Sequence, residues 1–379
     1  MEVVTLSTAK PRITDVRPIP LRGPIDRPVR MALGEMRWRN GCLIEITTDS
    51  GVVGIGESWV NFPSWAPAER VATITEGIRP LLIGESVDDP RRIQRKLVST
   101  LQRIALQWGA IGPIYQAISG VDLALWDLVG KLAGVPVWQL LGAPRQDLVP
   151  AYASGLGPDS PDEQAALAVE AGFAAVKLKV GFGQERDERN LAGVRSAIGD
   201  RPLFSDANQG WSLDAARRMA PVLAEAEARW IEEPLSVDDD AWDDVGNVFK
   251  MLVAGGENLY GQGEFNRWLA GNRLQVLQPD VAKCGGITAA FDILTAPSAA
   301  RARLAPHYFG GAVGLAATVH LFAALPIERR VMVEYDVNAN RLRESLLTEP
   351  LLIGGQLRVP DGPGLGITLD ERALAELRM

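Results

Sequence analysis

The chain has 379 residues, too many for one ordinary domain of about 150 residues and enough for a barrel of about 250 residues with a second domain. With 47% hydrophobic and 23% charged residues, the composition excludes a largely disordered protein, and no apolar stretch approaches the roughly 18 residues of a membrane helix. The net charge of −8 argues against a nucleic-acid partner, and two cysteines, Cys42 and Cys284, are too few for a disulfide framework. Because the N-terminus also lacks the apolar core of a signal peptide, we expect a cytoplasmic, enzyme-sized protein.

The first 130 residues predict an α+β domain. Residues 39–58 contain two strand-like runs separated by Asp49, Ser50 and Gly51, which is a typical hairpin turn. Helical spacing of apolar residues follows at 67–82, 90–105 and 112–132. The last of these helices is expected to lead into the next domain.

Short apolar runs then recur at intervals of 23 to 28 residues, with helical patterns between them such as 163–172 and 212–228. The runs are 149–153, 174–180, 202–207, 229–233, 251–257, 275–280, 303–307 and 331–335. Alternating strands and helices predict a parallel sheet, and eight strands favour a closed (β/α)₈ barrel, with an open doubly wound sheet as the alternative. The tail after residue 345 is rich in turn residues and is expected to fold back on the first domain.

Ionisable residues stand where nearly all of these strands end. In chain order they are Lys177 and Lys179, Asp206 with Asn208, Glu232, Glu257, Asp280 with Lys283, His307 and Glu334. Working residues of such a barrel lie at the C-terminal ends of its strands. The pattern therefore predicts an active site at that end of the barrel.

Three carboxylates follow successive strands and would lie side by side. Asp206, Glu232 and Glu257 would repel one another unless a cation intervened, and an all-oxygen ligand set suits a hard ion such as Mg²⁺. The alternative for each acid alone is a helix cap or a surface ion pair. The occurrence of all three at consecutive strand ends favours the metal site.

Lys177 and Lys179 occupy alternate positions of an apolar strand and therefore face the same side. A solvated surface is the usual place for such a pair, but it does not fit so apolar a run. Burial lowers the pKa of a lysine, whereas an anionic site raises it. One lysine would neutralise a substrate carboxylate bound at the metal, and the other would accept a proton.

The sequence contains two histidines. His307 ends the seventh strand and Asp280 ends the sixth, so the two side chains would be in reach of each other and form an acid/base dyad. A packing role is the alternative for His307 taken alone. His320 lies within a helical pattern and is expected to pack in the core. A site that combines the metal, the two lysines and the histidine–aspartate dyad would be able to remove the weakly acidic proton α to a carboxylate.

Six motifs in the second part of the chain carry a family resemblance. They are VKLKVG (176–181), DANQGW (206–211), WIEEPL (230–235), GGENL (255–259), QPDVAKCGG (278–286) and APHYFGG (305–311). Together they resemble the mandelate racemase subgroup of the enolase superfamily. This resemblance implies a modified (β/α)₇β barrel over 131–345, and an α+β capping domain built from 1–130 and the tail 346–379.

The resemblance also implies roles for the residues at the metal. Asp206, Glu232 and Glu257 would be Mg²⁺ ligands. Lys179 would be the base for one stereochemistry, and Lys177 would lie near the metal-bound substrate carboxylate.

The remaining strand-end residues receive roles around the substrate from the same resemblance. His307, paired with Asp280, would act as base or acid on the opposite face. Glu334 would hydrogen-bond the substrate carboxylate, and Asn208 would face the substrate. Lys283 would have a supporting electrostatic role.

Bases on both faces of a substrate permit two reactions. An acid-sugar dehydratase would remove the α proton and protonate the departing β-hydroxyl, giving a 2-keto-3-deoxy product. A racemase or epimerase would return a proton to the opposite face. Dehydration is the commoner outcome among proteins with this pattern and is our expectation by analogy. A barrel that binds metal without catalysis is a more remote alternative.

Substrate specificity is expected from a capping loop at residues 20–40. It contains Trp38 and five arginines, namely Arg22, Arg27, Arg30, Arg37 and Arg39. Arg37 and Trp38 are the candidate substrate contacts, because arginine suits bidentate binding of a second carboxylate and would make the substrate a diacid. Ordinary solvated arginines of a hairpin are the alternative. A second loop, 59–65, is expected to close over the site.

The partners that we expect are a small carboxylate substrate and further copies of the chain, which would form a homo-oligomer.

Overall fold

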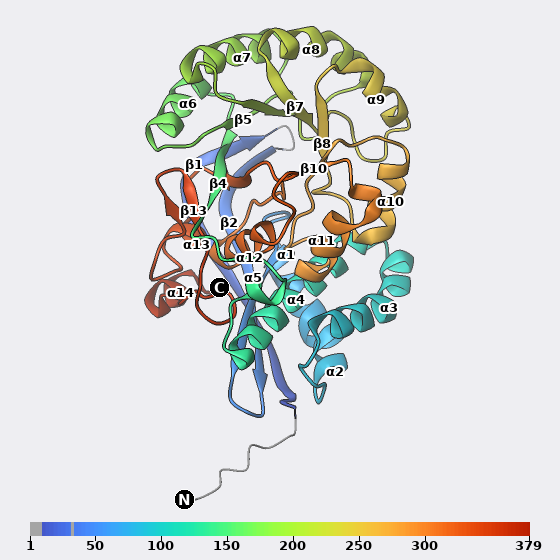
Figure 1. Ribbon diagram of the computed structural model, residues 1–379, viewed down its shortest axis with the longest axis vertical. Coiled ribbons are helices and arrows are strands. Elements are labelled where there is room, and N and C mark those ends of the chain that lie inside the picture. The colour runs from blue at the N-terminus through green and yellow to red at the C-terminus, as the bar shows by residue number, and fades with distance from the viewer. Residues whose placement is uncertain (1–9, 32–33) are drawn as a thin grey trace, which may run out of the picture.

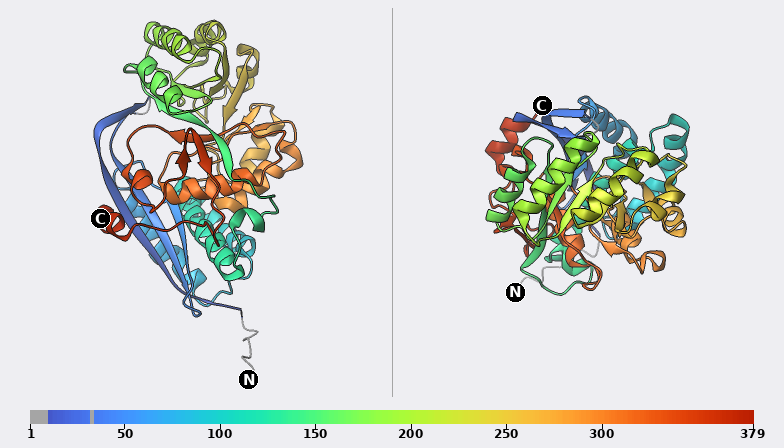
Figure 2. Two further views of the ribbon diagram at one scale, coloured as in Figure 1. Left: turned by 60° about the vertical axis from the view of Figure 1, so that its left-hand side comes forward. Right: turned by 90° about the horizontal axis from the view of Figure 1, so that it is seen from above.

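The computed structural model describes residues 10–31 and 34–379, which form a barrel with a second domain packed across one side of it (Figures 1 and 2). The second domain begins with an antiparallel sheet in the order β1–β2–β3, formed by Ile13–Met31, Gly34–Thr48 and Val53–Trp59. Helices follow: α1 (Ala66–Ala72), the π-helix η1 (Thr73–Ile78), α2 (Arg79–Leu82), α3 (Pro90–Trp108) and α4 (Ile111–Ala133). The predicted hairpin and the three predicted helical regions are confirmed.

The segment at residues 20–40 is not the loop that we expected. It forms most of a long hairpin in which β1 pairs with β2 from Ile13 opposite Thr48 to Met31 opposite Gly34. β1 contains four prolines, which argue against a strand in the middle of a sheet because proline cannot donate a ladder hydrogen bond. β1 lies at the edge of its sheet, where proline is tolerated.

The described residues contain eight strands that form the barrel, and each overlaps a run that the sequence predicts. They are β4 (Leu148–Leu156), β5 (Val176–Lys179), β6 (Leu203–Asp206), β7 (Ala228–Glu232), β8 (Leu252–Gly255), β9 (Val276–Leu277), β10 (Arg303–Leu304) and β11 (Val333–Asp336). Neighbours pair in parallel from β4 to β10, and β11 pairs in parallel with β4. A parallel bridge from Leu304 to Arg330, just before β11, closes the ring. The barrel is therefore closed, and the open-sheet alternative is wrong.

Helices follow seven of the strands on the outside of the barrel (Figure 1). They are α6 (Pro161–Glu170), α7 (Gln184–Ile198), α8 (Leu213–Glu225), α9 (Trp242–Val248), α10 (Gly261–Ala270), α11 (Gly286–Thr295) with the short η2 (Pro297–Ala299), and α12 (Ala312–Ala323). β11 is followed only by α13 (Arg341–Glu344), a single turn. This is the modified (β/α)₇β arrangement that the resemblance implies.

Aromatic side chains fill part of the barrel interior. The rings of Phe204 and Trp230 stack with centroids 3.6 Å apart, and the ring of Tyr152 meets both edge-on at 5.2 and 5.8 Å. All three side chains are buried. A packed floor of this kind leaves the C-terminal ends of the strands as the place for polar chemistry.

The end of the chain returns to the first sheet. After α5 (Val137–Leu140), which precedes the barrel, the later elements outside it are β12 (Leu352–Ile353), β13 (Gln356–Arg358) and α14 (Glu371–Leu377). Arg378 forms an antiparallel bridge with Leu21 of β1, as Figure 2 shows where the red C-terminal end lies beside the blue strands. The domain boundaries 1–130, 131–345 and 346–379 stay a prediction. No helix among residues 10–31 and 34–379 has the length and apolar character needed to cross a bilayer.

β3 packs so closely on α4 that a glycine is required between them. A Cβ atom at Gly56 would collide with the backbone oxygen of Gly120 and lie 2.6 Å from the amide nitrogen of Ala124. We expect Gly56→Ala to lower the free energy of unfolding by about 1–3 kcal/mol, as overpacking does, and to lower the melting temperature in thermal unfolding. Gly77→Ala is the control, because a Cβ there meets no atom within 4 Å. Equal stability of the two variants would contradict this close contact.

Candidate active site

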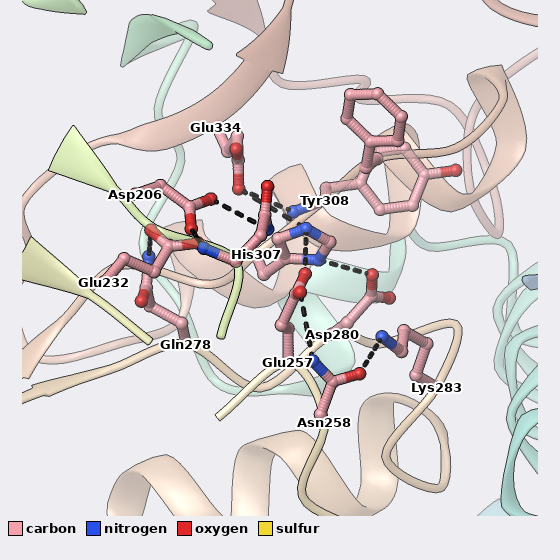
Figure 3. A network of polar contacts seen from close by, with 12 residues as sticks. Asp206, Glu232, Glu257, Asn258, Gln278, Asp280, Lys283, His307, Tyr308 and Glu334 are labelled. Carbon is pink, nitrogen blue, oxygen red and sulfur yellow. Dashed lines mark hydrogen bonds and ion pairs between the residues drawn. The ribbon is translucent and has the colours of Figure 1, made fainter. Parts of the chain in front are cut away.

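The predicted strand-end residues meet at one end of the barrel (Figure 3). Asp206 and Glu232 are the last residues of β6 and β7 and lie opposite each other in the parallel register. Glu257 follows β8 by two residues, and all three carboxylates are buried. Strand alternation and parallel register thus bring together acids that lie about 25 residues apart in the sequence.

Lys177 is the central cation of this cluster. Its Nζ lies 2.8 Å from both carboxylate oxygens of Glu232, 2.7 Å from Oε1 of Glu334 and 3.7 Å from Oδ2 of Asp206. Glu334 also accepts a hydrogen bond from the hydroxyl of Ser154 on β4. The pKa of Lys177 lies well above its ordinary value, because the attraction of Glu232 and Glu334 outweighs the opposing effect of burial.

Lys179 lies next to Asp206. Its Nζ is 2.5 Å from Oδ2 of Asp206, whose Oδ1 accepts a hydrogen bond of 2.7 Å from the backbone N–H of Asn208. Burial lowers the pKa of Lys179, but Asp206 raises it further, and the net shift is upward. In this arrangement Lys179 carries a proton and is an ammonium ion.

His307 stands between three carboxylates. Its Nδ1 lies 2.8 Å from Oδ2 of Asp280, as predicted from the neighbouring strands. Its Nε2 lies 2.5 Å from Oε2 of Glu257 and 3.9 Å from Oε2 of Glu334, contacts that the sequence did not predict. Burial opposes ionisation of the ring, but these carboxylates raise the pKa of His307 well above its usual value. The other histidine, His320, packs inside the fold, and burial lowers its pKa to about 4.

The donor set fits a hard divalent cation. Within the described part of the chain no three acidic, histidine or cysteine side chains point at a common coordination position, because Lys177, Lys179 and His307 lie among the carboxylates. Burial, and then the charge of Asp206, raise the pKa of Glu232 to about 8, so a nearby cation would stabilise the ionised carboxylate. The buried Oδ1 of Asn208 is also without a hydrogen-bond partner among the described residues. These oxygens offer the ligands that Mg²⁺ prefers.

Two amide side chains, Asn258 and Gln278, support the acids, and neither was singled out in the sequence analysis. Nδ2 of Asn258 donates to Glu257 at 3.1 Å and to Glu233 at 2.9 and 3.1 Å, and its Oδ1 accepts from Nζ of Lys283 at 3.0 Å. Gln278 donates to Oε2 of Glu232 at 2.6 Å. Asn258 directly follows the predicted run 251–257 and Gln278 lies two residues before Asp280 in the run 275–280, so a search near the strand ends for amides as well as acids would have found them. Lys283 is thus linked to the carboxylates through the side chain of Asn258. Its Nζ lies 4.7 Å from the centre of the Trp59 ring.

The arginines of the β1–β2 hairpin are distributed differently. The Arg37 side chain is 74% exposed and pairs with Glu35, and Trp38 is 47% exposed. Arg39 is only 1% exposed and its Nη2 lies 2.5 Å from Oδ2 of Asp336 at the end of β11. Arg39 is therefore not a solvated arginine, and its charge is already neutralised. The side chain of Arg27 lies outside the described residues.

The segment 59–65 is tied down at several points. Nη2 of Arg22 donates to the backbone oxygen of Ser64 at 2.8 Å, and Nδ2 of Asn61 donates to the backbone oxygen of Phe309 at 2.6 Å. Asn40 donates to the backbone oxygen of Asn61 at 3.4 Å. The segment thus lies against the barrel loop that carries His307, whereas closure over a substrate stays a prediction.

Two family models match the chain. Residues 14–142 match the mandelate racemase/muconate lactonizing enzyme N-terminal domain, and residues 162–373 match the enolase C-terminal domain-like model. D-galactarolactone cycloisomerase of Agrobacterium fabrum is 35% identical over 97% of this chain and 99% of its own. L-talarate/galactarate dehydratase of Salmonella typhimurium is 33% identical over 87% of this chain and 81% of its own.

Solved structures show the same likeness. A mandelate racemase/muconate lactonizing enzyme from Bordetella bronchiseptica superimposes with a TM-score of 0.88 at 37% identity, covering 97% of this chain and 99% of the other. A Bradyrhizobium enolase complexed with magnesium and mandelic acid superimposes with a TM-score of 0.85 at 29% identity, covering 98% and 99%. From its sequence, its fold and both family models, the chain belongs to the mandelate racemase/muconate lactonizing enzyme family of the enolase superfamily.

Proposed function

We propose that the protein is a Mg²⁺-dependent lyase that removes the proton α to the carboxylate of an acid sugar and then eliminates water. The observation that carries this proposal is the meeting of two kinds of proton-transfer group, Lys179 and the His307–Asp280 dyad, at one cluster of carboxylates. Dehydratases of acid sugars among the relatives support the class of substrate.

The side chains of this site would divide the work as follows. Lys179 would take the α proton, which leaves an enediolate. Lys177 would hold positive charge beside the substrate carboxylate, with Glu334 close to it. His307, protonated because of its carboxylate neighbours and oriented through Nδ1 by Asp280, would give its Nε2 proton to the departing β-hydroxyl. Asn208 and Lys283 would orient and neutralise groups at the edge of the site.

Asp206, Glu232 and Glu257 would hold the metal. When bound there, Mg²⁺ would supply positive charge for the substrate carboxylate and weaken the ion pair between Asp206 and Lys179, so that the amine becomes a base. Related structures that contain magnesium support this choice of ion.

Ring opening is a second candidate, favoured by the cycloisomerase that is 35% identical over 97% of this chain. If the departing β-oxygen belongs to a lactone ring, the same elimination loses no atoms and the product is an isomer of the substrate. Racemisation or epimerisation needs no elimination and is the third outcome of the same proton removal. Arg37 and Trp38, which are exposed, remain the proposed contacts for a second carboxylate, whereas Arg39 is buried against Asp336.

Incubation in D₂O with Mg²⁺ and a panel of acid sugars, diacids and their lactones would separate these reactions. We expect a 2-keto-3-deoxy product, detected by ¹H NMR and as its semicarbazone. An isomeric, ring-opened product from a lactone would instead establish the second candidate. An α-deuterated epimer without any keto product would refute elimination.

A further inference from the structure

The loop that carries His307 receives little support from the barrel sheet. β10 ends at Leu304, three residues before His307, and α12 begins only at Ala312. The N–H of Ala305 still donates to the oxygen of Leu277 on β9 at 3.1 Å, and beyond it two residues of the β11 region hold the loop backbone. Asn340 donates to the oxygen of Gly310 at 2.8 Å, and the N–H of Tyr308 donates to Glu334 at 3.3 Å. The ring itself contacts Asp280 and Glu257, but the backbone that carries it depends largely on contacts from outside the barrel sheet.

Those contacts come from the first domain. Nδ2 of Asn61, just after β3, donates to the backbone oxygen of Phe309 at 2.6 Å. Glu57 of β3 accepts from the N–H of Gly311 at 2.6 Å and from the N–H of Gly314 at 2.9 Å. Both side chains are buried, so water cannot easily replace these hydrogen bonds. They link residues about 250 positions apart in the sequence.

We propose that Asn61 and Glu57 are positioning residues, which fix the loop 307–311 and thereby hold the His307 ring against Asp280 and Glu257. A displacement of about 1 Å at a reacting group costs about 10²-fold in rate, so this support bears directly on the acid/base step. The inference rests on the proposed function only for the chemical role of His307. The geometric claim, that the first domain sets the place of the ring, stands apart from it.

The presence of just two histidines in the sequence gives a direct test. In protein labelled with ¹⁵N-histidine, the imidazole signals of His307 and His320 can be assigned with His307→Asn. Asn61→Ala removes the donor to Phe309, and Asn61→Asp keeps the shape of the side chain but replaces its amide by a carboxylate. In both variants we expect loss of the single set of His307 ring signals, which should shift or split, while those of His320 stay unchanged.

Gln94→Ala is the matched control. Gln94 is also a buried amide of the first domain that donates to a barrel backbone oxygen, that of Gly285 at 3.1 Å, but outside the loop 307–311. The Gln94→Ala variant should leave the ring signals of both His307 and His320 unchanged. Unchanged His307 signals in Asn61→Ala would overturn the proposal, as would equal changes at both histidines, which indicate general loosening. Because the measurement needs no substrate, its outcome is independent of whether elimination is the reaction.

Discussion

Lys179→Met and His307→Asn should each lower turnover by about 10²- to 10⁴-fold, the range that a positioned acid or base contributes, while the fold survives. Asp206 would keep the backbone N–H of Asn208 and the nearby Lys177 after the loss of Lys179. Asp280 would likewise keep its hydrogen bond of 2.7 Å from the N–H of Ala282 after the loss of His307. Steady-state kinetics and thermal unfolding of each variant give the two measurements.

The two variants also separate an enzyme from an inactive metal-binding barrel. If the barrel only binds metal, these ion pairs would contribute to stability alone. Both variants would then unfold at a lower temperature, and there would be no turnover to lose. If the two variants keep wild-type turnover on an accepted substrate, the assignment of Lys179 and His307 is wrong. Comparison of the two variants should also show which base acts on which face of the substrate. Removal of the proton from a given face should persist in one variant and fail in the other.

Removal of divalent cations with EDTA should reduce turnover by at least about 10³-fold, and added Mg²⁺ should restore it, because metal charge stabilisation contributes several kcal/mol to the transition state. Asp206→Asn should weaken Mg²⁺ binding as measured by isothermal titration calorimetry, since it replaces a charged ligand by a neutral one. Full activity in EDTA would show that these carboxylates serve another purpose.

Two controls belong to this experiment. Asp214→Asn removes an exposed carboxylate on α8 and should leave Mg²⁺ affinity unchanged. The metal-free protein should remain folded, because Lys177 already forms ion pairs with both Glu232 and Glu334. A collapse of the fold in EDTA would mean that loss of activity reports unfolding and not the loss of a catalytic cation.

The barrel could be predicted from the sequence because its signal is local and repeated. Each strand is a short apolar run buried on both faces, and its last residues supply the polar groups. Once the runs are placed, parallel register fixes which groups are neighbours, and the contact between Asp280 and His307 follows. The residue types of the site were predictable for the same reason, whereas their roles in catalysis stay predictions.

Other features depend on contacts that no local pattern reveals. β1 was missed because Pro18, Pro20, Pro24 and Pro28 argue against a strand, and its place at a sheet edge is known only from the tertiary structure. The contact of Glu257 with His307 depends on side-chain conformation. Arg37 and Arg39 are two positions apart, where strand alternation would place them on one face, and alternation does not predict that Arg37 is exposed beside Glu35 while Arg39 is buried against Asp336.

The bridge between Leu21 and Arg378 spans 378 − 21 = 357 positions of the chain. A ribosome that adds about 5–20 residues per second needs roughly 20–70 s between these two residues. Throughout that time the outer edge of β1 near Leu21 lacks the neighbour that later shields it, and an unpaired strand edge invites association with other chains. The prolines along β1 then have a second use, because they withhold backbone donors from unwanted partners while the nascent polypeptide is being completed.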